Sequence, residues 1–319
     1  MDSLDIRLLR AMFPDGVFAL SGVDPRPSVQ RLARTVGASR MTVRRRLTRW
    51  KEGGFWKGLV PFPNPDALAR SFQMQSFTLE PGRDRGRIES SLVEIFEPVF
   101  LFQTEHVYNT VLLAEARRAS ERRQRAFRAM HVGKVNCPPL DIAFPRSTVL
   151  LGTRDWRILR ALRRSPDPDW AAVAEEVGVT VRGLERRIGR LRAGNALFFL
   201  PELDFRRSPG SVAWVGVLFG IGLDMKRLEQ ELARRYPDLL AIDPIFPIEL
   251  LLPSSVRTSV GGSFSFFLPV PSASTGDQIR RDIGAVPGVV EALVAFPTRN
   301  SAIPRTIDHC IQSVLEVGG

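Results

Sequence analysis

The chain has 319 residues, 44% of them apolar, and a formal net charge of +11. This length exceeds what one hydrophobic core usually organises, and the apolar content excludes a compositionally disordered protein, so we expect two or more folded domains. The positive charge makes nucleic acid or an anionic membrane surface the natural class of partner. Cys137 and Cys310 lie far apart and without a C-x-x-C companion, so we expect neither a disulfide framework nor a metal or cofactor.

Membrane and export signals are absent from the sequence pattern. No run of 18 apolar residues occurs, and the chain opens with acidic and apolar residues instead of a basic segment followed by an apolar run. We therefore expect a cytoplasmic protein with no membrane partner.

The first elements in chain order are three helices. The segment "LDIRLLRAM" from Leu4 has the apolar spacing of a helix, and a loop rich in Pro and Gly follows it. Ser28 is placed to cap a second helix, and Gly37 permits a sharp turn after it. Ser39 is placed to cap a third helix. The order helix, turn, helix predicts a helix-turn-helix.

The third helix has two unlike faces. Val43, Leu47 and Trp50 form a stripe that we expect to be buried. The opposite face carries positive charge, and Glu52 is the only acid from Ser28 to Gly53. A charged face of this kind is often merely solvated, but the cap, the turn, the stripe and the one-sided charge together favour a helix in the major groove. The predicted DNA contacts of this first copy are Arg40, Met41, Thr42, Arg44, Arg45, Thr48, Arg49 and Lys51.

Arg46 is expected to have a different role, because it directly precedes the stripe residue Leu47. We predict that it pairs with Asp5 of the first helix and so holds the three helices together. Arg187 and Asp155 occupy the equivalent positions in a second copy and are predicted to pair in the same way.

Extended runs follow each three-helix segment. The segments "GGFWKGLVPF" and "GNALFFLPEL" predict a turn into a strand that lies beside DNA in a winged arrangement, with Phe55, Trp56, Phe198 and Phe199 in the core and Lys57 as the contact. Further strands are predicted at "FQMQSFTLE", "PVFLFQTEH" and "TVLLAEA", and later at "VAWVGVLFG", "PIFPIELLL" and "SFSFFLPV". Helices are predicted between them at "RIESSLVEIF", "SERRQRAFRAM", "DMKRLEQELARRY" and "GDQIRRDIGAV". A last short helix is expected around Thr306 to Leu315. Each half then has the order βαββαβ.

The helical segment repeats. "SVQRLARTVGASRMTVRRRLTRWKEGG" aligns with "DWAAVAEEVGVTVRGLERRIGRLRAGN" at a constant offset of 141, so that Gly37 meets Gly178. In the second copy Gly183, Glu185 and Gly189 replace polar or basic residues of the first. We therefore expect the first copy to read bases and the second to attract phosphate. The predicted DNA contacts of the second copy are Arg182, Arg186 and Arg190.

These motifs resemble the Lrp/AsnC family of transcription regulators. The residues that carry the resemblance are "LDIRLLRAM" and "LARTVGASRMTVRRRLTRWKEGGF", repeated as "RDWRILRAL" and "VAEEVGVTVRGLERRIGRLRAGNAL", and "AVPGVVEALVAFPT" resembles the last passage of the family's sheet domain. The resemblance implies double-stranded DNA, a small-molecule effector and a homodimer as partners. Two copies in one chain imply a built-in pseudo-dimer. The family's Gly-Asp-Tyr-Asp turn is missing, which argues against an amino-acid effector.

The predicted fold is therefore α+β, with two winged helix-turn-helix domains alternating with two ferredoxin-like βαββαβ domains. The predicted domains are 1–62, 63–149, 150–207 and 208–300, followed by a tail at 301–319. The predicted function is transcription regulation through DNA, and the protein is predicted not to be an enzyme. A scaffold on DNA, in which the second half only assembles, is a further alternative. Sirohaem decarboxylases resemble the same architecture and are the enzymatic alternative, although the chain has only three histidines, His106, His131 and His309, and no Arg-His pair in the first strand of either sheet.

Overall fold

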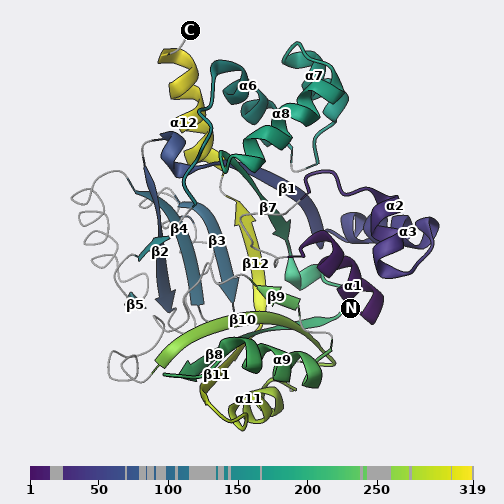
Figure 1. Ribbon diagram of the computed structural model, residues 1–319, viewed down its shortest axis with the longest axis vertical. Coiled ribbons are helices and arrows are strands. Elements are labelled where there is room, and N and C mark those ends of the chain that lie inside the picture. Colours follow the sequence, from purple (N-terminus) through teal and green to yellow (C-terminus); the bar gives the residue numbers. More distant parts are fainter. Residues whose placement is uncertain are drawn as a thin grey trace. The chain divides into compact units, whose positions relative to one another are not determined.

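The computed structural model describes residues 1–14, 24–68, 70–78, 84, 90, 98–104, 107–114, 134–135, 140–142, 145–165, 167–237, 240–242, 260–272, 275–302 and 304–317. Helices and strands are mixed (Figure 1), and the strand pairs whose register is defined are antiparallel. The chain is therefore α+β, as predicted. Its contacts divide it into two compact units, which we describe separately.

The first unit combines the first three helices with a later part of the chain. It comprises Met1–Trp56, Gln103–Glu105 and Leu203–Arg299. Its helices are α1 (Ser3–Met12), α2 (Val29–Val36), α3 (Arg40–Glu52), the 3-10 turn η2 (Phe205–Arg207), α9 (Met225–Arg235) and α11 (Gly276–Gly284). Its strands are β8 (Ser211–Gly220), β9 (Leu240–Ile242), β10 (Val260–Val270) and β11 (Val289–Ala295).

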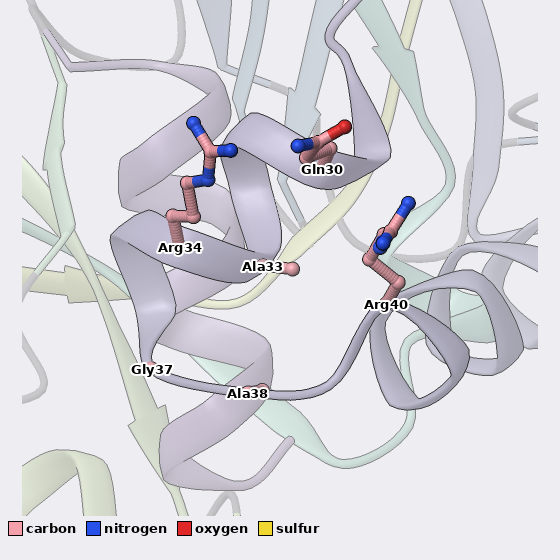
Figure 2. Close-up of a pocket in the computed structure, with 6 residues that line it drawn as sticks. All are labelled: Gln30, Ala33, Arg34, Gly37, Ala38 and Arg40. Carbon is pink, nitrogen blue, oxygen red and sulfur yellow. The ribbon is translucent and has the colours of Figure 1, made fainter.

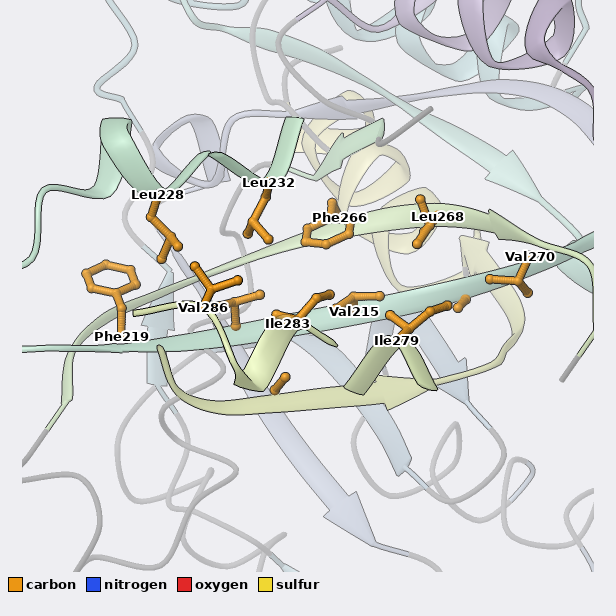
Figure 3. Packing of buried hydrophobic residues seen from close by; sticks show 13 residues of the cluster. Val215, Phe219, Leu228, Leu232, Phe266, Leu268, Val270, Ile279, Ile283 and Val286 are labelled. Atoms are coloured by element: carbon orange, nitrogen blue, oxygen red, sulfur yellow. The ribbon is translucent and has the colours of Figure 1, made fainter. Parts of the chain in front are cut away.

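These four strands form one sheet with the spatial order β11-β8-β10-β9. In chain order the described elements of this segment read strand, helix, strand, strand, helix, strand, which matches the βαββαβ order predicted for the second half. Apolar residues from α9 and α11 pack on the strands, and Figure 3 shows their side chains pointing toward one another. Leu228 and Leu232 are one turn apart on α9, as are Ile279 and Ile283 on α11, and all four are buried. This spacing gives each helix one apolar face, and burying each such side chain stabilises the fold by about 2 kcal/mol.

A chain of aromatic rings runs from α3 to the sheet within the first unit. Trp50 of α3 lies edge-on to Phe55, with ring centroids 5.7 Å apart. Phe55 packs on Phe205 at 6.1 Å, and Phe205 packs on Phe267 of β10 at 4.7 Å. The backbone N–H of Asp204 donates to the carbonyl of Phe55 at 2.9 Å. The first helix-turn-helix segment is thus packed on the sheet formed by residues 211–295.

The second unit comprises Lys57–Phe102, His106–Glu202 and Asn300–Gly319. Its strands are β1 (Trp56–Pro63), β2 (Ser71–Thr78), β3 (Pro98–Thr104), β4 (Val107–Ala114), β5 (Lys134–Val135), β6 (Leu140–Ile142), β7 (Leu197–Leu203) and β12 (Pro297–Ala302), some of which extend past the unit's limits by a few residues. Its helical elements are the 3-10 turn η1 (Pro65–Leu68), α6 (Thr153–Arg163), α7 (Trp170–Glu176), α8 (Val181–Ala193) and α12 (Pro304–Val317). A six-stranded sheet has the order β12-β3-β4-β2-β5, with β6 also paired to β2.

The strands that follow the two helix-turn-helix segments pair with each other. β1 and β7 form a separate two-stranded sheet, although 141 residues separate their equivalent positions. Phe55, Trp56, Phe198 and Phe199 are buried, as predicted. Lys57, which we predict to contact DNA, forms an ion pair with Glu202 at 3.3 Å. The pairing of β1 with β7 brings Lys57 close to Glu202. The two residues are far apart in the sequence, so this ion pair could not be predicted from it.

The predicted C-terminal helix is confirmed as α12, and it lies beside α6 (Figure 1). Arg163 of α6 donates from Nε to Asp308 Oδ1 of α12 at 2.5 Å and from Nη1 to the carbonyl of Pro61 at 2.6 Å. Its guanidinium also lies 5.2 Å from the centre of the Phe62 ring. A buried arginine therefore joins α6, α12 and β1.

Several sequence-based expectations lie outside the described residues. They include nearly all of the helix predicted at 87–96, the helix predicted at 120–130, the strand predicted at 244–252, His106, His131 and Cys137. Cys310 is described, and its side chain is buried. The predicted helices at "DMKRLEQELARRY" and "GDQIRRDIGAV" are confirmed as α9 and α11.

Candidate nucleic-acid interface

The sharp turn between α2 and α3 is built from two caps and one glycine. The Ser28 hydroxyl accepts from the backbone N–H of Arg31, and the Ser39 hydroxyl accepts from the backbone N–H of Thr42 at 3.0 Å. Gly37 ends α2 in the left-handed conformation, with φ of +66°. Both caps satisfy amide groups that a helix start leaves without partners, so the local sequence determines where α3 begins.

Replacing Gly37 by alanine is expected to destabilise the first unit by about 1 kcal/mol, because a side chain in the left-handed region is strained. No atom lies within 4 Å of the position that the new Cβ would occupy, so the cost comes from the backbone alone. Gly37→Asn is the control, since asparagine tolerates this conformation better. Urea unfolding measures both variants, and equal stability of Gly37→Ala and wild type would contradict the assignment.

The inner face of α3 holds the three helices together. Val43 and Trp50 are buried as predicted, whereas Leu47 is half-buried. Arg46 Nη1 lies 3.1 Å from Asp5 Oδ1, and Arg46 Nη2 lies 2.6 Å from Asp2 Oδ2. The predicted pairing of Arg46 with Asp5 is confirmed, and Asp2 is a second partner that we did not predict.

The same arrangement occurs in the second copy. Arg187 Nη2 donates to Asp155 Oδ2 at 3.1 Å, and the Nε of the same arginine donates to the other carboxylate oxygen. Asp155 is 1% exposed. The predicted pairing of Arg187 with Asp155 is therefore confirmed. The hydrogen bond to Asp155 raises the pKa of Arg187 against the opposing effect of burial.

Acid is expected to weaken the link between α1 and α3. Burial raises the pKa of Asp2, but hydrogen bonds from the Asp5 backbone and from Arg46 outweigh it and hold that pKa below its usual value. A carboxylate with a lowered folded pKa stabilises the fold above the unfolded pKa, about 3.9, and this contribution is lost as the pH falls through the folded value.

The variant Asp2→Asn tests this, because asparagine caps a helix as well as aspartate does but carries no charge. Its melting temperature is expected to lie below that of wild type above about pH 4, and the two are expected to converge as the pH falls below that value. Asp277→Asn, whose side chain is 80% exposed, is the control. A difference that does not change with pH would contradict the role of the Asp2 charge.

The outer face of α3 is exposed along its whole length. At 100° per residue, Met41, Arg45 and Thr48 point directly away from the buried stripe, with basic residues on both shoulders. Met41 is 64% exposed. The Thr42 hydroxyl is engaged with the Ser39 hydroxyl at 2.9 Å, so it belongs to the cap as well as to the outer face. The predicted residues that the structure leaves exposed on this face are Arg40, Met41, Thr42, Arg44, Arg45, Thr48, Arg49 and Lys51.

A hollow of about 500 Å³ lies at the turn, between α2 and the start of α3. Gln30, Ala33, Arg34, Gly37, Ala38 and Arg40 line it. Figure 2 shows Arg34 from α2 and Arg40 from α3 on opposite sides of it. Both arginines are exposed. We predicted Arg40 from the sequence and missed Arg34, whose position on the outer side of α2, next to the turn, was the signal available.

The second copy has the same backbone but a different face. Asp169 and Thr180 cap α7 and α8, and Gly178 has φ of +69°. The predicted contacts on α8 are exposed, as those on α3 are; they are Arg182, Arg186 and Arg190. Glu185 is exposed among them and Gly183 and Gly189 offer no side chain, so the face carries less positive charge than α3.

No family model and no curated protein matches the sequence. Among solved structures, the siroheme decarboxylase NirDL matches over 98% of this chain and 99% of its own, with 12% identity and a TM-score of 0.46. The same decarboxylase in complex with an iron-uroporphyrin III analogue matches with the same identity and TM-score. The leucine response regulatory protein of Mycobacterium tuberculosis matches over 47% of this chain and 95% of its own, with 20% identity and a TM-score of 0.29.

The prediction that this chain is not an enzyme is contradicted by this comparison. The solved structures that match over nearly the whole chain are those of a decarboxylase. With 12% identity and a TM-score of 0.46, the similarity assigns no activity to this chain, but the exclusion of an enzyme no longer stands. The resemblance to the Lrp/AsnC family stays a prediction.

The described part of the chain shows neither a metal cluster nor a membrane-spanning helix. Within it, no three side chains of His, Cys, Asp or Glu gather in a way that could hold a metal ion. Of the helices described, none has the length and hydropathy needed to cross a bilayer. His309 is exposed on α12. The exposed basic face of α3 is the best-defined candidate site in the described residues.

Proposed function

We propose that the first helix-turn-helix binds double-stranded DNA with α3 in the major groove, and that the protein regulates transcription in the manner of the Lrp/AsnC family. The observation that carries this proposal is the outer face of α3, on which the arginines are exposed while its inner face is locked by buried apolar side chains and the Arg46 ion pairs. A rigid helix with one basic face is the shape that enters a major groove.

The residues divide by task. Arg44 and Arg45, near the N-terminal end of α3, would reach base edges through their planar forks, and Arg49 and Lys51 would reach phosphates. Arg34, across the hollow from Arg40, adds a cation from α2. In the second copy, α8 supplies phosphate attraction through Arg182, Arg186 and Arg190.

The proposal extends to the domain arrangement. We propose two winged helix-turn-helix domains at 1–62 and 150–207, alternating with ferredoxin-like domains at 63–149 and 208–300 and followed by the tail at 301–319. The βαββαβ order of the elements described between residues 211 and 295 supports this for the second half. A homodimer and a small-molecule effector remain expectations from the family resemblance.

A salt titration tests DNA binding. Fluorescence anisotropy with a mixed library of labelled duplexes should show affinity falling with a log–log slope of about −4, because roughly four phosphate contacts each release a counterion. Affinity should then fall about 100-fold between about 50 and 200 mM salt. If no duplex is retained at the lowest salt, the proposed function is wrong.

Decarboxylation of a tetrapyrrole is the second candidate function. The feature of this chain that favours it is the formal net charge of +11, since a basic protein attracts a ligand with several carboxylates as it attracts DNA. Absorbance titration with an iron uroporphyrin separates the two functions. A saturating spectral change at one equivalent per chain, with no retention of duplex, would favour the enzyme, and an unchanged spectrum would exclude it.

A further inference from the structure

Met41 differs from every other residue on the outer face of α3. All of α3 is described, and Met41 is its only large apolar side chain that is exposed, at 64%. Its neighbours along the outermost line are Arg45 and Thr48, one and two turns further on. The outermost line of this basic face thus begins, at the N-terminal end of α3, with an apolar side chain whose exposure to water is unfavourable.

The charge along this line indicates which end of α3 approaches the bases. Glu52 lies on the same line as Met41, Arg45 and Thr48 but at the C-terminal end of the helix. A carboxylate there would be repelled by phosphates, whereas the N-terminal end carries no acid. The Met41 end therefore lies deeper in the groove than the Glu52 end.

Only one group in the major groove has the matching chemistry. Adenine, guanine and cytosine present hydrogen-bond donors and acceptors there, and thymine alone adds a methyl group. The thioether side chain of methionine is flexible and polarisable, so it adapts to an apolar partner. We propose that Met41 contacts the 5-methyl group of a thymine and makes that thymine a required base of the DNA site.

The second copy supplies a contrast within the same chain. Arg182 of α8 occupies the position equivalent to Met41 and is exposed. An arginine there favours guanine or phosphate instead of a methyl group. The thymine requirement consequently belongs to α3, and the natural exchange Met41→Arg removes it without removing positive charge.

This inference rests on the proposed DNA binding, and the experiment separates the two. A duplex is first enriched from a random library with the full-length wild-type protein. Each thymine of that duplex is then replaced by uracil, which removes only the methyl group. Dissociation constants are measured for wild type, Met41→Ala and Met41→Arg, with melting temperatures as the control for folding.

For wild type, uracil at one position should weaken binding about fourfold, the effect expected from losing the burial of one methyl group. For both variants the same replacement should change affinity less than about twofold, and Met41→Arg should bind random duplex at least as tightly as wild type. Tight binding by wild type with no uracil effect at any thymine would overturn the role of Met41, as would an equal uracil effect in Met41→Ala. Failure to enrich or retain any duplex would overturn the proposed function as well.

Discussion

Replacing Asp308 by alanine is expected to lower the free energy of unfolding of the second unit by about 2 kcal/mol and its melting temperature by about 4–8 °C. The reason lies in its partner. The side chain of Arg163 is 2% exposed, whereas that of Asp308 is 45% exposed. Burial lowers the pKa of Arg163 against the opposing effects of the Asp308 charge and hydrogen bond, so the site disfavours a cation. Removing the carboxylate leaves this buried charge with less compensation.

Two further variants make the test specific. Asp277→Ala removes an exposed aspartate that lies 3.5 Å from Arg280, and a surface pair of this kind contributes at most about 0.5 kcal/mol. The double variant Arg163→Met, Asp308→Ala should recover part of the loss, because an apolar side chain of similar length needs no partner. Thermal melts and urea unfolding measure all three. Equal stability of Asp308→Ala and Asp277→Ala would show that Asp308 does not stabilise the Arg163 charge.

Features that depend on nearby residues could be predicted from the sequence. The caps at Ser28 and Ser39 and the turn at Gly37 follow from residue types that favour these conformations over three or four positions. The pairing of Arg46 with Asp5 spans 41 residues, but it could be predicted because helix geometry fixed the direction of Arg46 and the repeat offered the same pair again.

Features that depend on contacts between distant segments could not be predicted from the sequence. Lys57 pairs with Glu202 and Arg163 pairs with Asp308, each across 145 residues with no pattern that links the two segments. The aromatic chain that joins Trp50 to Phe267 depends on two separately predicted segments packing together. Leu47 is half-buried although its position matches the stripe, because burial also depends on what the rest of the unit places beside the helix.

The sequence was enough to predict which face of α3 is exposed, but not which contacts its side chains make. Helical periodicity identifies which residues of α3 point outward, since 100° per residue applies to any straight helix. It does not show that the Thr42 hydroxyl bonds to Ser39, or that Arg34 faces the same hollow as Arg40. These depend on the angle between α2 and α3, which only the folded structure supplies.

Removing three arginines from α3 should weaken DNA binding far more than removing three from α8. We expect Arg44→Ala, Arg45→Ala and Arg49→Ala together to lower affinity for an enriched duplex about 100-fold, since two base contacts and one phosphate contact are lost. The log–log salt slope should fall by only about 1, because Arg49 is the one residue of the three that is assigned to a phosphate. Preference for the enriched duplex over random duplex should also disappear, because base edges are read from this helix.

The comparison with α8 removes the same amount of charge. Arg182→Ala, Arg186→Ala and Arg190→Ala together should lower affinity less than about tenfold and leave the preference for the enriched duplex unchanged, because phosphate contacts carry no sequence information. Alanine is the best helix former, and all six arginines are exposed, so neither triple variant is expected to unfold. Equal losses of affinity and of preference in the two variants would mean that both copies read bases. The asymmetry between α3 and α8, which rests on Glu185, Gly183 and Gly189, would then have no consequence for recognition.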